Sequence, residues 1–174
     1  FFIGFFFNIN FNIFLKYYVF LQFFGKQNIP ILGRGIRPTG AKNCCSFKPC
    51  KPLYPKYPDT YGMPSRHSQS IAFFSTLCIL YLLTNMNNKN IFINIFGCFI
   101  FICFILFIMY TRILFKCHTL NQTIIGSLIG IILAILLFKY KDKIKKKLKK
   151  YKNYELYLFV ISTLLLCYYI IVLL

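Results

Sequence analysis

Two histidines in this sequence each stand near an arginine, where a polar stretch meets an apolar run. His67 follows Arg66 in the stretch YGMPSRHSQ, and His118 comes six residues after Arg112. Imidazole titrates near physiological pH, so it can act as a nucleophile or as a proton carrier. A guanidinium group binds phosphoryl oxygens in pairs. Together these residue types predict chemistry on a phosphate group.

Two further residues fit a phosphate site. Arg37 precedes a proline after the first apolar run, and Ser65 stands directly before a helical run. A serine in that place can cap the helix and contact an anion, since the free N–H groups of a helix start favour negative charge. The one carboxylate nearby is Asp59, which argues against catalysis by a carboxylate pair. The spacing of cysteines and histidines does not indicate a metal site, so neither a metal nor a cofactor is expected.

The elements that position these residues are expected to be membrane helices. Hydrophobic residues make up 58% of the chain, and a helix needs about 20 apolar residues to cross a bilayer. The expected spans cover residues 1–24, 64–84, 91–110, 118–138 and 154–174. The predicted fold class is therefore all-α, a polytopic membrane helix bundle of about five transmembrane helices.

The spans divide the chain into three predicted parts. Residues 1–138 form a membrane core with one long loop at 25–63. Residues 139–153 form a lysine-rich cytoplasmic linker, and residues 154–174 form an additional transmembrane helix.

The charge distribution indicates which side of the membrane each loop faces. The chain has 21 basic and 3 acidic residues, and in so apolar a chain the expected partner of that charge is the lipid bilayer, not nucleic acid. Basic residues divide evenly between the two faces, so their count decides nothing. Their density favours the cytoplasm for the segment from Lys139 to Lys152, which holds nine lysines. The predicted phosphate site then lies on the opposite side.

The long loop carries two further patterns. Prolines recur at every third position from Pro49 to Pro58, which fits a stiff polyproline II spacer or an SH3-type ligand. Cys44, Cys45 and Cys50 can form a disulfide if this loop faces an oxidising compartment.

These motifs carry a resemblance to a known family. The pattern R-P … P-S-x-H … [S/T]-R-x5-H resembles the three-part signature of the type 2 phosphatidic acid phosphatase superfamily. Within it, YGMPSRHSQ and HTLNQ are most similar to the dolichyldiphosphatase branch. The resemblance covers residues 37 to about 138 and implies a phosphatase-like membrane core.

The resemblance also implies a role for each residue of the site. By its place in the third motif, His118 would attack the terminal phosphorus and form a phosphohistidine. His67 would protonate the leaving phosphate and then activate water. The residues that would hold the phosphate oxygens are Arg37, Ser65 and Arg112. Phosphoryl transfer depends mostly on positioning and charge stabilisation, so the arginines supply the positive field without a divalent metal.

Three departures from the family pattern stand out. The family's lysine, seven residues before the Arg-Pro pair, is Pro30 here; Lys26 or Arg34 would substitute if they shared a helical face with Arg37. A glycine between serine and histidine is Arg66, which would either contact phosphate or point to water. The aspartate four residues after the nucleophile is Gln122, whose amide oxygen can still accept a hydrogen bond from the ring and orient it.

The expected function follows from the resemblance. The chain would be a dolichyldiphosphatase-like hydrolase that converts dolichyl diphosphate to dolichyl phosphate and phosphate, recycling the carrier for N-glycosylation. Its expected place is the endoplasmic reticulum membrane, with the site facing the lumen. Its partners would be a membrane lipid diphosphate and the bilayer. The alternatives are an undecaprenyl-diphosphate or phosphatidate phosphatase, a catalytically inactive lipid-phosphate binder, and a structural or channel-like membrane protein.

Overall fold

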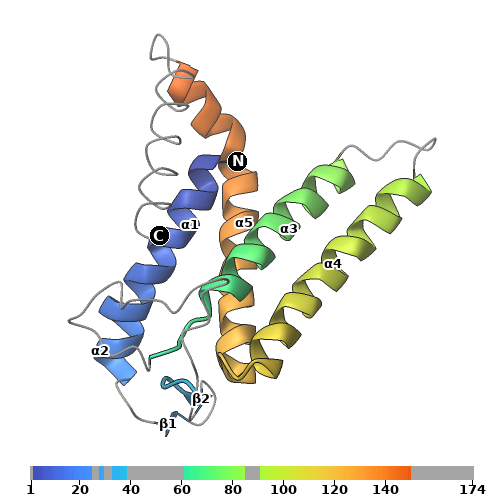
Figure 1. The fold of residues 1–174 in the computed structure, drawn as a ribbon. Coiled ribbons are helices and arrows are strands. Elements are labelled where there is room, and N and C mark those ends of the chain that lie inside the picture. The colour runs from blue at the N-terminus through green and yellow to red at the C-terminus, as the bar shows by residue number, and fades with distance from the viewer. Residues whose placement is uncertain (1, 25–27, 30–32, 39–60, 85–90, 150–174) are drawn as a thin grey trace, which may run out of the picture.

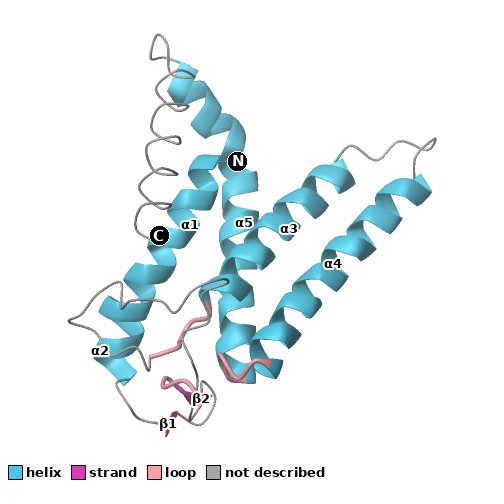
Figure 2. Ribbon diagram, in the orientation of Figure 1, coloured by secondary structure: helices cyan, strands magenta, loops and turns pink. Residues whose placement is uncertain are grey.

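A computed structural model describes residues 2–24, 28–29, 33–38, 61–84 and 91–149 of the chain (Figure 1). The helices are α1 (Phe2–Phe14), the π-helical segment η1 (Leu15–Phe20), α2 (Leu21–Phe24), α3 (Arg66–Thr84), α4 (Ile91–Leu114) and α5 (Leu120–Lys149). Two short strands, β1 (Asn28–Ile29) and β2 (Gly33–Arg34), pair antiparallel below them (Figure 2). The architecture is the predicted helical bundle.

Three of these helices are long and apolar enough to cross a membrane. They cover Arg66–Thr84, Ile91–Leu114 and Leu120–Lys147, and they confirm an integral membrane protein with an all-α bundle. The first expected span is helical from Phe2 to Phe24, through α1, η1 and α2. The expected span at 154–174 and most of the long loop lie outside the described residues.

The helix ends at residues 24, 84 and 91 coincide with the expected ones, whereas α3 and α5 each start two residues later than expected. α4 continues past residue 110 to Leu114, and within this extension Thr111 donates a side-chain hydrogen bond to the carbonyl of Ile108 at 2.8 Å. α5 starts at Leu120 and runs through the first part of the lysine-rich segment as far as Lys149. A helix of 30 residues is about 45 Å long, which exceeds the hydrocarbon thickness of about 30 Å.

Helix α3 lies at the centre of the bundle, with α1, α4 and α5 packed around it (Figure 1). The core joins Phe73 and Leu77 of α3 to Ala134 of α5. Gly126 and Gly130 let α5 approach at backbone distance, because a Cβ would collide with the backbone of Ser65, just before α3, in the first case and with that of Gln69 in α3 in the second. Small residues of this kind are how membrane helices pack closely without a hydrophobic driving force.

Amide side chains hold α1 against α3. The Nδ2 of Asn12 donates to Oε1 of Gln69 at 2.6 Å, and the Nε2 of Gln69 donates to Oδ1 of Asn8 at 2.9 Å. The Nδ2 of Asn8 also donates to the hydroxyl of Ser70 at 3.3 Å. Asn12 contacts Gln69, whereas Asn8, which is earlier on α1, also contacts Ser70, which is later on α3. The two helices therefore run in opposite directions. One turn beyond Asn12, η1 therefore passes the start of α3, and Lys16 lies there.

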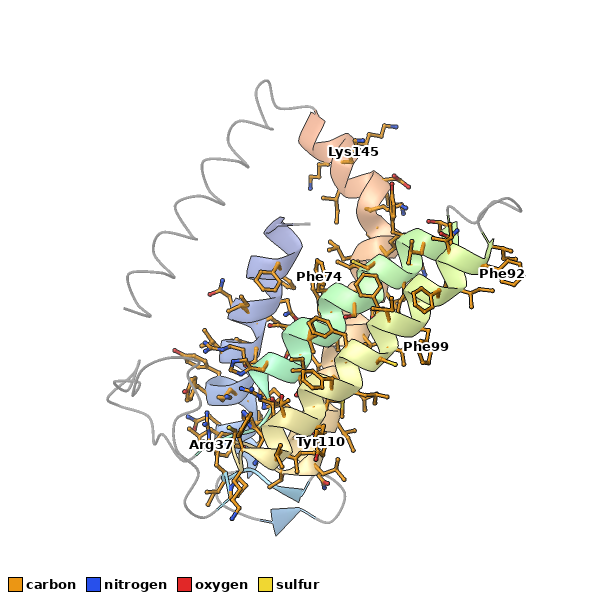
Figure 3. All side chains as sticks on the ribbon, turned by 45° about the vertical axis from the view of Figure 1, so that its right-hand side comes forward. Arg37, Phe74, Phe92, Phe99, Tyr110 and Lys145 are labelled. Atoms are coloured by element: carbon orange, nitrogen blue, oxygen red, sulfur yellow. The ribbon has the colours of Figure 1, made fainter. Side chains whose placement is uncertain are left out.

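Helix α4 has a different environment, since none of its residues is buried. Phe92 and Phe99 point away from the bundle in Figure 3 and are 83% and 61% exposed. An outward apolar face of this kind fits contact with lipid. The same view places Arg37 at one end of the bundle and Lys145 at the other, so the predicted site and the lysine-rich segment are on opposite sides.

Candidate active site

Backbone hydrogen bonds join the segments that carry the three motifs. The N–H of Gly62 donates to the carbonyl of Gly35 at 2.9 Å, and Ile36 and Tyr61 form an antiparallel bridge. The N–H of Ser65 donates to the carbonyl of Gln122 at 3.0 Å. The segment that ends in Arg37 and the start of α3 are thereby fixed to the start of α5.

The side chain of Gln122 links all of these parts. It is fully buried, and its Nε2 donates to the carbonyls of Ile36 at 2.9 Å and Gly35 at 3.3 Å. Its Oε1 lies 3.0 Å from Nδ1 of His118, the contact that the spacing of four residues predicts. A glycine is required at position 62, since a Cβ there would collide with the Gln122 amide oxygen and lie 2.8 Å from Cγ of Arg37.

These contacts determine the protonation state of the His118 ring. The amide nitrogen of Gln122 must donate to two carbonyls, so its oxygen faces the ring and accepts a hydrogen bond. Nδ1 of His118 then carries the proton, and Nε2 keeps its lone pair. A neutral imidazole with a fixed tautomer and a free Nε2 is the form that a nucleophile needs.

The turn between α4 and α5 brings His118 back to Arg112. The N–H groups of Cys117 and His118 both donate to the carbonyl of Arg112, at 2.9 and 3.2 Å. The turn passes through Lys116, which has a positive φ of 52°. The Nε of Arg112 is buried and has no hydrogen-bond partner among the described residues, so this guanidinium retains a donor for an anion.

Ser65 caps α3 as predicted. It is fully buried, and its hydroxyl accepts hydrogen bonds from the N–H of Ser68 at 3.4 Å and from the Ser68 hydroxyl at 3.1 Å. Its carbonyl accepts the N–H of Gln69 at 3.0 Å. This fixes the first turn of α3, which carries Arg66 and His67, against the start of α5.

His67 lies in the same electropositive space as His118. Both Arg66 and His67 are partly buried in the first turn of α3. The cations whose charge acts on His67 are Arg112, Arg66, Lys16 and Arg37. Four separate parts of the chain therefore contribute positive charge to one place: η1, the segment after β2, the start of α3 and the end of α4.

Lys16 is a member of this group that the motifs do not identify. It is 7% exposed, lies in η1, and its charge acts on both His67 and His118. Segments of π-helix are rare and often occur at functional sites. One signal in the sequence points to it: Asn8, Asn12 and Lys16 form a polar stripe at intervals of four residues in an apolar run, and an ionisable residue inside a membrane span is functional by default.

The structure bears on the two substitutes expected for the family's lysine. Arg34 lies in β2, where it pairs with Asn28 of β1, and Lys26 lies outside the described residues. The premise of a shared helical face with Arg37 is wrong, because β1 (Asn28–Ile29) and β2 (Gly33–Arg34) are strands.

The group has no compensating carboxylate among the described residues. Their one acidic side chain, Asp142, is exposed in the lysine-rich part of α5, far from the motifs along the helix. Within the described part of the chain, three or more potential metal-ligating side chains do not gather anywhere. Buried cations need a counter-charge, and the chemistry of these donors suits an oxyanion such as phosphate.

Cys117, next to His118, is buried and disulfide-bonded. Cys78, Cys98 and Cys103 are free thiols, so the partner of Cys117 lies outside the described residues. Disulfides persist in oxidising compartments.

The comparisons with known proteins agree with this fold. The chain is a membrane protein whose helix ends hold two histidines among several cations. Residues 11–146 match the family model of the PAP2 superfamily, and the chain belongs to that superfamily, whose members are phosphatases. The match begins at residue 11 and so includes the helix that carries Lys16. No curated protein and no solved structure matches the chain.

The pKa of His118 gives a first prediction. Burial, together with the charges of Lys16 and Arg37, lowers this pKa from its ordinary 6.5 to about 2. Because the pKa is depressed, the neutral ring persists as the pH falls. Diethyl pyrocarbonate acylates neutral imidazole, so its rate constant at His118, followed by mass spectrometry of the peptide, should change less than about twofold between pH 8 and 5. Free imidazole with a pKa near 6.5 loses about thirtyfold over that range, and a similar loss at His118 would contradict the prediction.

The role of Gln122 gives a second prediction. Gln122→Glu keeps the shape of the side chain but turns a carboxylate oxygen toward the carbonyls of Gly35 and Ile36, where the amide now donates. We expect a lower melting temperature and a loss of activity of about tenfold or more, since a buried charged group without its hydrogen bonds is strongly destabilising. Thermal unfolding and phosphate release measure the two effects. The exposed control Gln22→Glu, the same change near the end of α2, should change neither; an unaltered Gln122→Glu protein would show that the amide donors are dispensable.

Proposed function

We propose that this protein is a membrane lipid phosphatase that removes the terminal phosphate of a polyprenyl diphosphate, with dolichyl diphosphate as the preferred substrate. The observation that carries the proposal is the His118 ring, whose Nδ1 is held by Gln122 at 3.0 Å beside a group of buried and half-buried cations. A nucleophile and a positive field are the two requirements for moving a phosphoryl group.

The proposed reaction has two steps. Nε2 of His118 attacks the terminal phosphorus, the bond to the bridging oxygen breaks, and His67 gives a proton to the departing lipid monophosphate. Water then attacks the phosphohistidine, His67 takes a proton from that water, and inorganic phosphate leaves with the restored imidazole. His118 is thus the nucleophile, and His67 acts first as general acid and then as general base.

The cations stabilise the charge that develops on the phosphoryl oxygens. Three cations that come from separate segments of the chain are Lys16, Arg37 and Arg112. The hydroxyl of Ser65 lies at the start of α3, the helix that carries His67. Arg66 adds charge beside His67. Groups that are fixed before the substrate arrives need no reorganisation during the reaction, which makes them effective in a site shielded from water.

Two observations support a lipid substrate met on the non-cytoplasmic side. The site lies at the ends of the spanning helices, so a lipid headgroup reaches it while the tail remains in the bilayer. The disulfide at Cys117 fits an oxidising compartment such as the lumen of the endoplasmic reticulum, and the lysine-rich end of α5 lies on the other side.

The proposal is tested by measuring phosphate release by the purified protein from dolichyl diphosphate, undecaprenyl diphosphate and phosphatidate in detergent micelles. The expected result is the highest kcat/KM for dolichyl diphosphate and release that depends on His118. A preference for phosphatidate would show that the substrate is a glycerolipid and not a polyprenyl diphosphate. No release from any of the three lipids would indicate a protein that binds lipid phosphates without hydrolysing them.

A further inference from the structure

We propose that an apolar pocket between α3 and α4 binds the isoprenoid tail of the substrate whose diphosphate occupies the site. This inference rests on the proposed function and adds a second subsite to it. The pocket has a volume of about 270 Å³ and is lined by Cys78, Tyr81 and Leu82 of α3 and by Phe101 of α4. Its lining presents only apolar surface.

The pocket is bounded by contacts that hold α3 and α4 at a fixed separation. On the side nearer the site, Phe74 and Phe101 pack edge to face with ring centroids 6.4 Å apart. On the other side, Gly97 allows a close approach, since a Cβ there would lie 2.9 Å from Cδ1 of Leu82. Between these contacts the helices leave a space that the described side chains do not fill.

Both walls of the pocket lead to the catalytic residues. Cys78 lies eleven residues after His67 on α3, and Phe101 lies eleven residues before Arg112 on α4. At about 1.5 Å per residue each separation is about 16 Å along its helix. That distance is roughly half of the hydrocarbon thickness of about 30 Å, so the pocket lies near the middle of the bilayer, a depth that only a long tail reaches from the site.

The shape and lining favour a hydrocarbon chain as the occupant. An apolar cavity of about 150 Å³ is already large enough to bind benzene, so this pocket can admit a methyl-branched segment, whereas a protein helix about 10 Å wide cannot enter it. The pocket offers no polar surface to a headgroup. A polyprenyl tail that leaves the site would run over the exposed side of the Phe74–Phe101 contact and then enter the pocket beyond it.

Filling the pocket should separate long substrates from short ones. In Cys78→Phe the new ring takes the space, and we expect kcat/KM for dolichyl diphosphate to fall about tenfold while kcat/KM for geranyl diphosphate, whose tail is too short to reach, stays within about twofold. Each buried CH₂ group contributes about 0.8 kcal/mol, so losing even two of them amounts to about tenfold. The matched control is Cys103→Phe, the same change at an exposed free thiol of α4, which should affect neither substrate.

A second measurement does not depend on activity. A dolichyl diphosphate analogue with a diazirine in the fourth isoprene unit should crosslink to the peptides that contain Cys78–Leu82 or Phe101, and Cys78→Phe should reduce that crosslinking. Crosslinks confined to the outward face of α4, or an unchanged ratio of the two substrates in Cys78→Phe, would overturn the tail subsite. An equal loss with phosphatidate would overturn the assignment to an isoprenoid. Absence of phosphate release from every substrate would instead refute the proposed function, while crosslinking would still report on the pocket.

Discussion

Replacing His118 with alanine is expected to reduce phosphate release from a polyprenyl diphosphate by a factor on the order of 10⁴ or more, as removal of a catalytic nucleophile does elsewhere. The proposed reaction forms a covalent bond between phosphorus and Nε2 of His118. No other described side chain at the site combines a neutral ring, a fixed tautomer and a free Nε2, so none can replace it. Release of phosphate from the lipid by the purified variant measures the effect directly. Binding of the substrate should persist, because the cations remain.

The control for this variant is His67→Gln. This variant keeps the nucleophile but lacks the group that protonates the leaving lipid monophosphate and activates water, so both steps should slow and the phosphohistidine that forms should persist longer than in the unchanged protein. Radioactive phosphate from the terminal position of the substrate should then remain on the peptide that contains His118, in an acid-labile and base-stable form. Label on another residue, or full activity in His118→Ala, would refute the phosphohistidine mechanism.

Lys16→Met is expected to lower kcat about 10²- to 10³-fold, the usual cost of removing one group that stabilises charge in a transition state. Methionine keeps the length and the apolar stem of the side chain but removes the ammonium that acts on both histidines. The stability of the bundle should hold or rise, since a buried charge is replaced by an apolar group. Activity and thermal unfolding, measured on the same preparation, separate the two effects.

Two companion variants sharpen this test. Lys16→Arg retains the charge and should recover part of the lost rate. Lys116→Met removes an exposed lysine two residues before His118 and should leave the rate within about twofold, because solvent screens its charge. If Lys116→Met were as harmful as Lys16→Met, the effect would reflect general loss of positive charge and not a specific contact with phosphate.

The parts of the site that could be predicted from the sequence are those with short, local spacing. Arg112 and His118 are joined by one tight turn, and His118 and Gln122 are separated by one helical turn, so their contacts follow from local geometry. The helical bundle also followed from the apolar runs, because a membrane leaves a chain few alternatives to the helix.

Lys16 could not be found in this way. Its place depends on how α1 packs against α3, through Asn8, Asn12 and Gln69, and such contacts join residues more than fifty positions apart. Counting back from Arg37 led instead to Lys26 and Arg34, a method that holds only inside one continuous helix. The pairing of Gln122 with the carbonyls before Arg37 was missed for the same reason, since it spans 86 positions.

The amide contacts between α1 and α3 bear finally on how the protein matures. An unpaired polar group in hydrocarbon costs several kcal/mol. If α1 were shifted by one turn, the amides of Asn8, Asn12 and Gln69 would all lose these hydrogen bonds at once. The alignment that satisfies them is also the one that places the ammonium of Lys16 near His67 and His118. Under the proposed function, correct assembly and catalytic competence would be acquired in a single event, and a wrongly inserted copy would be inert toward the lipids around it.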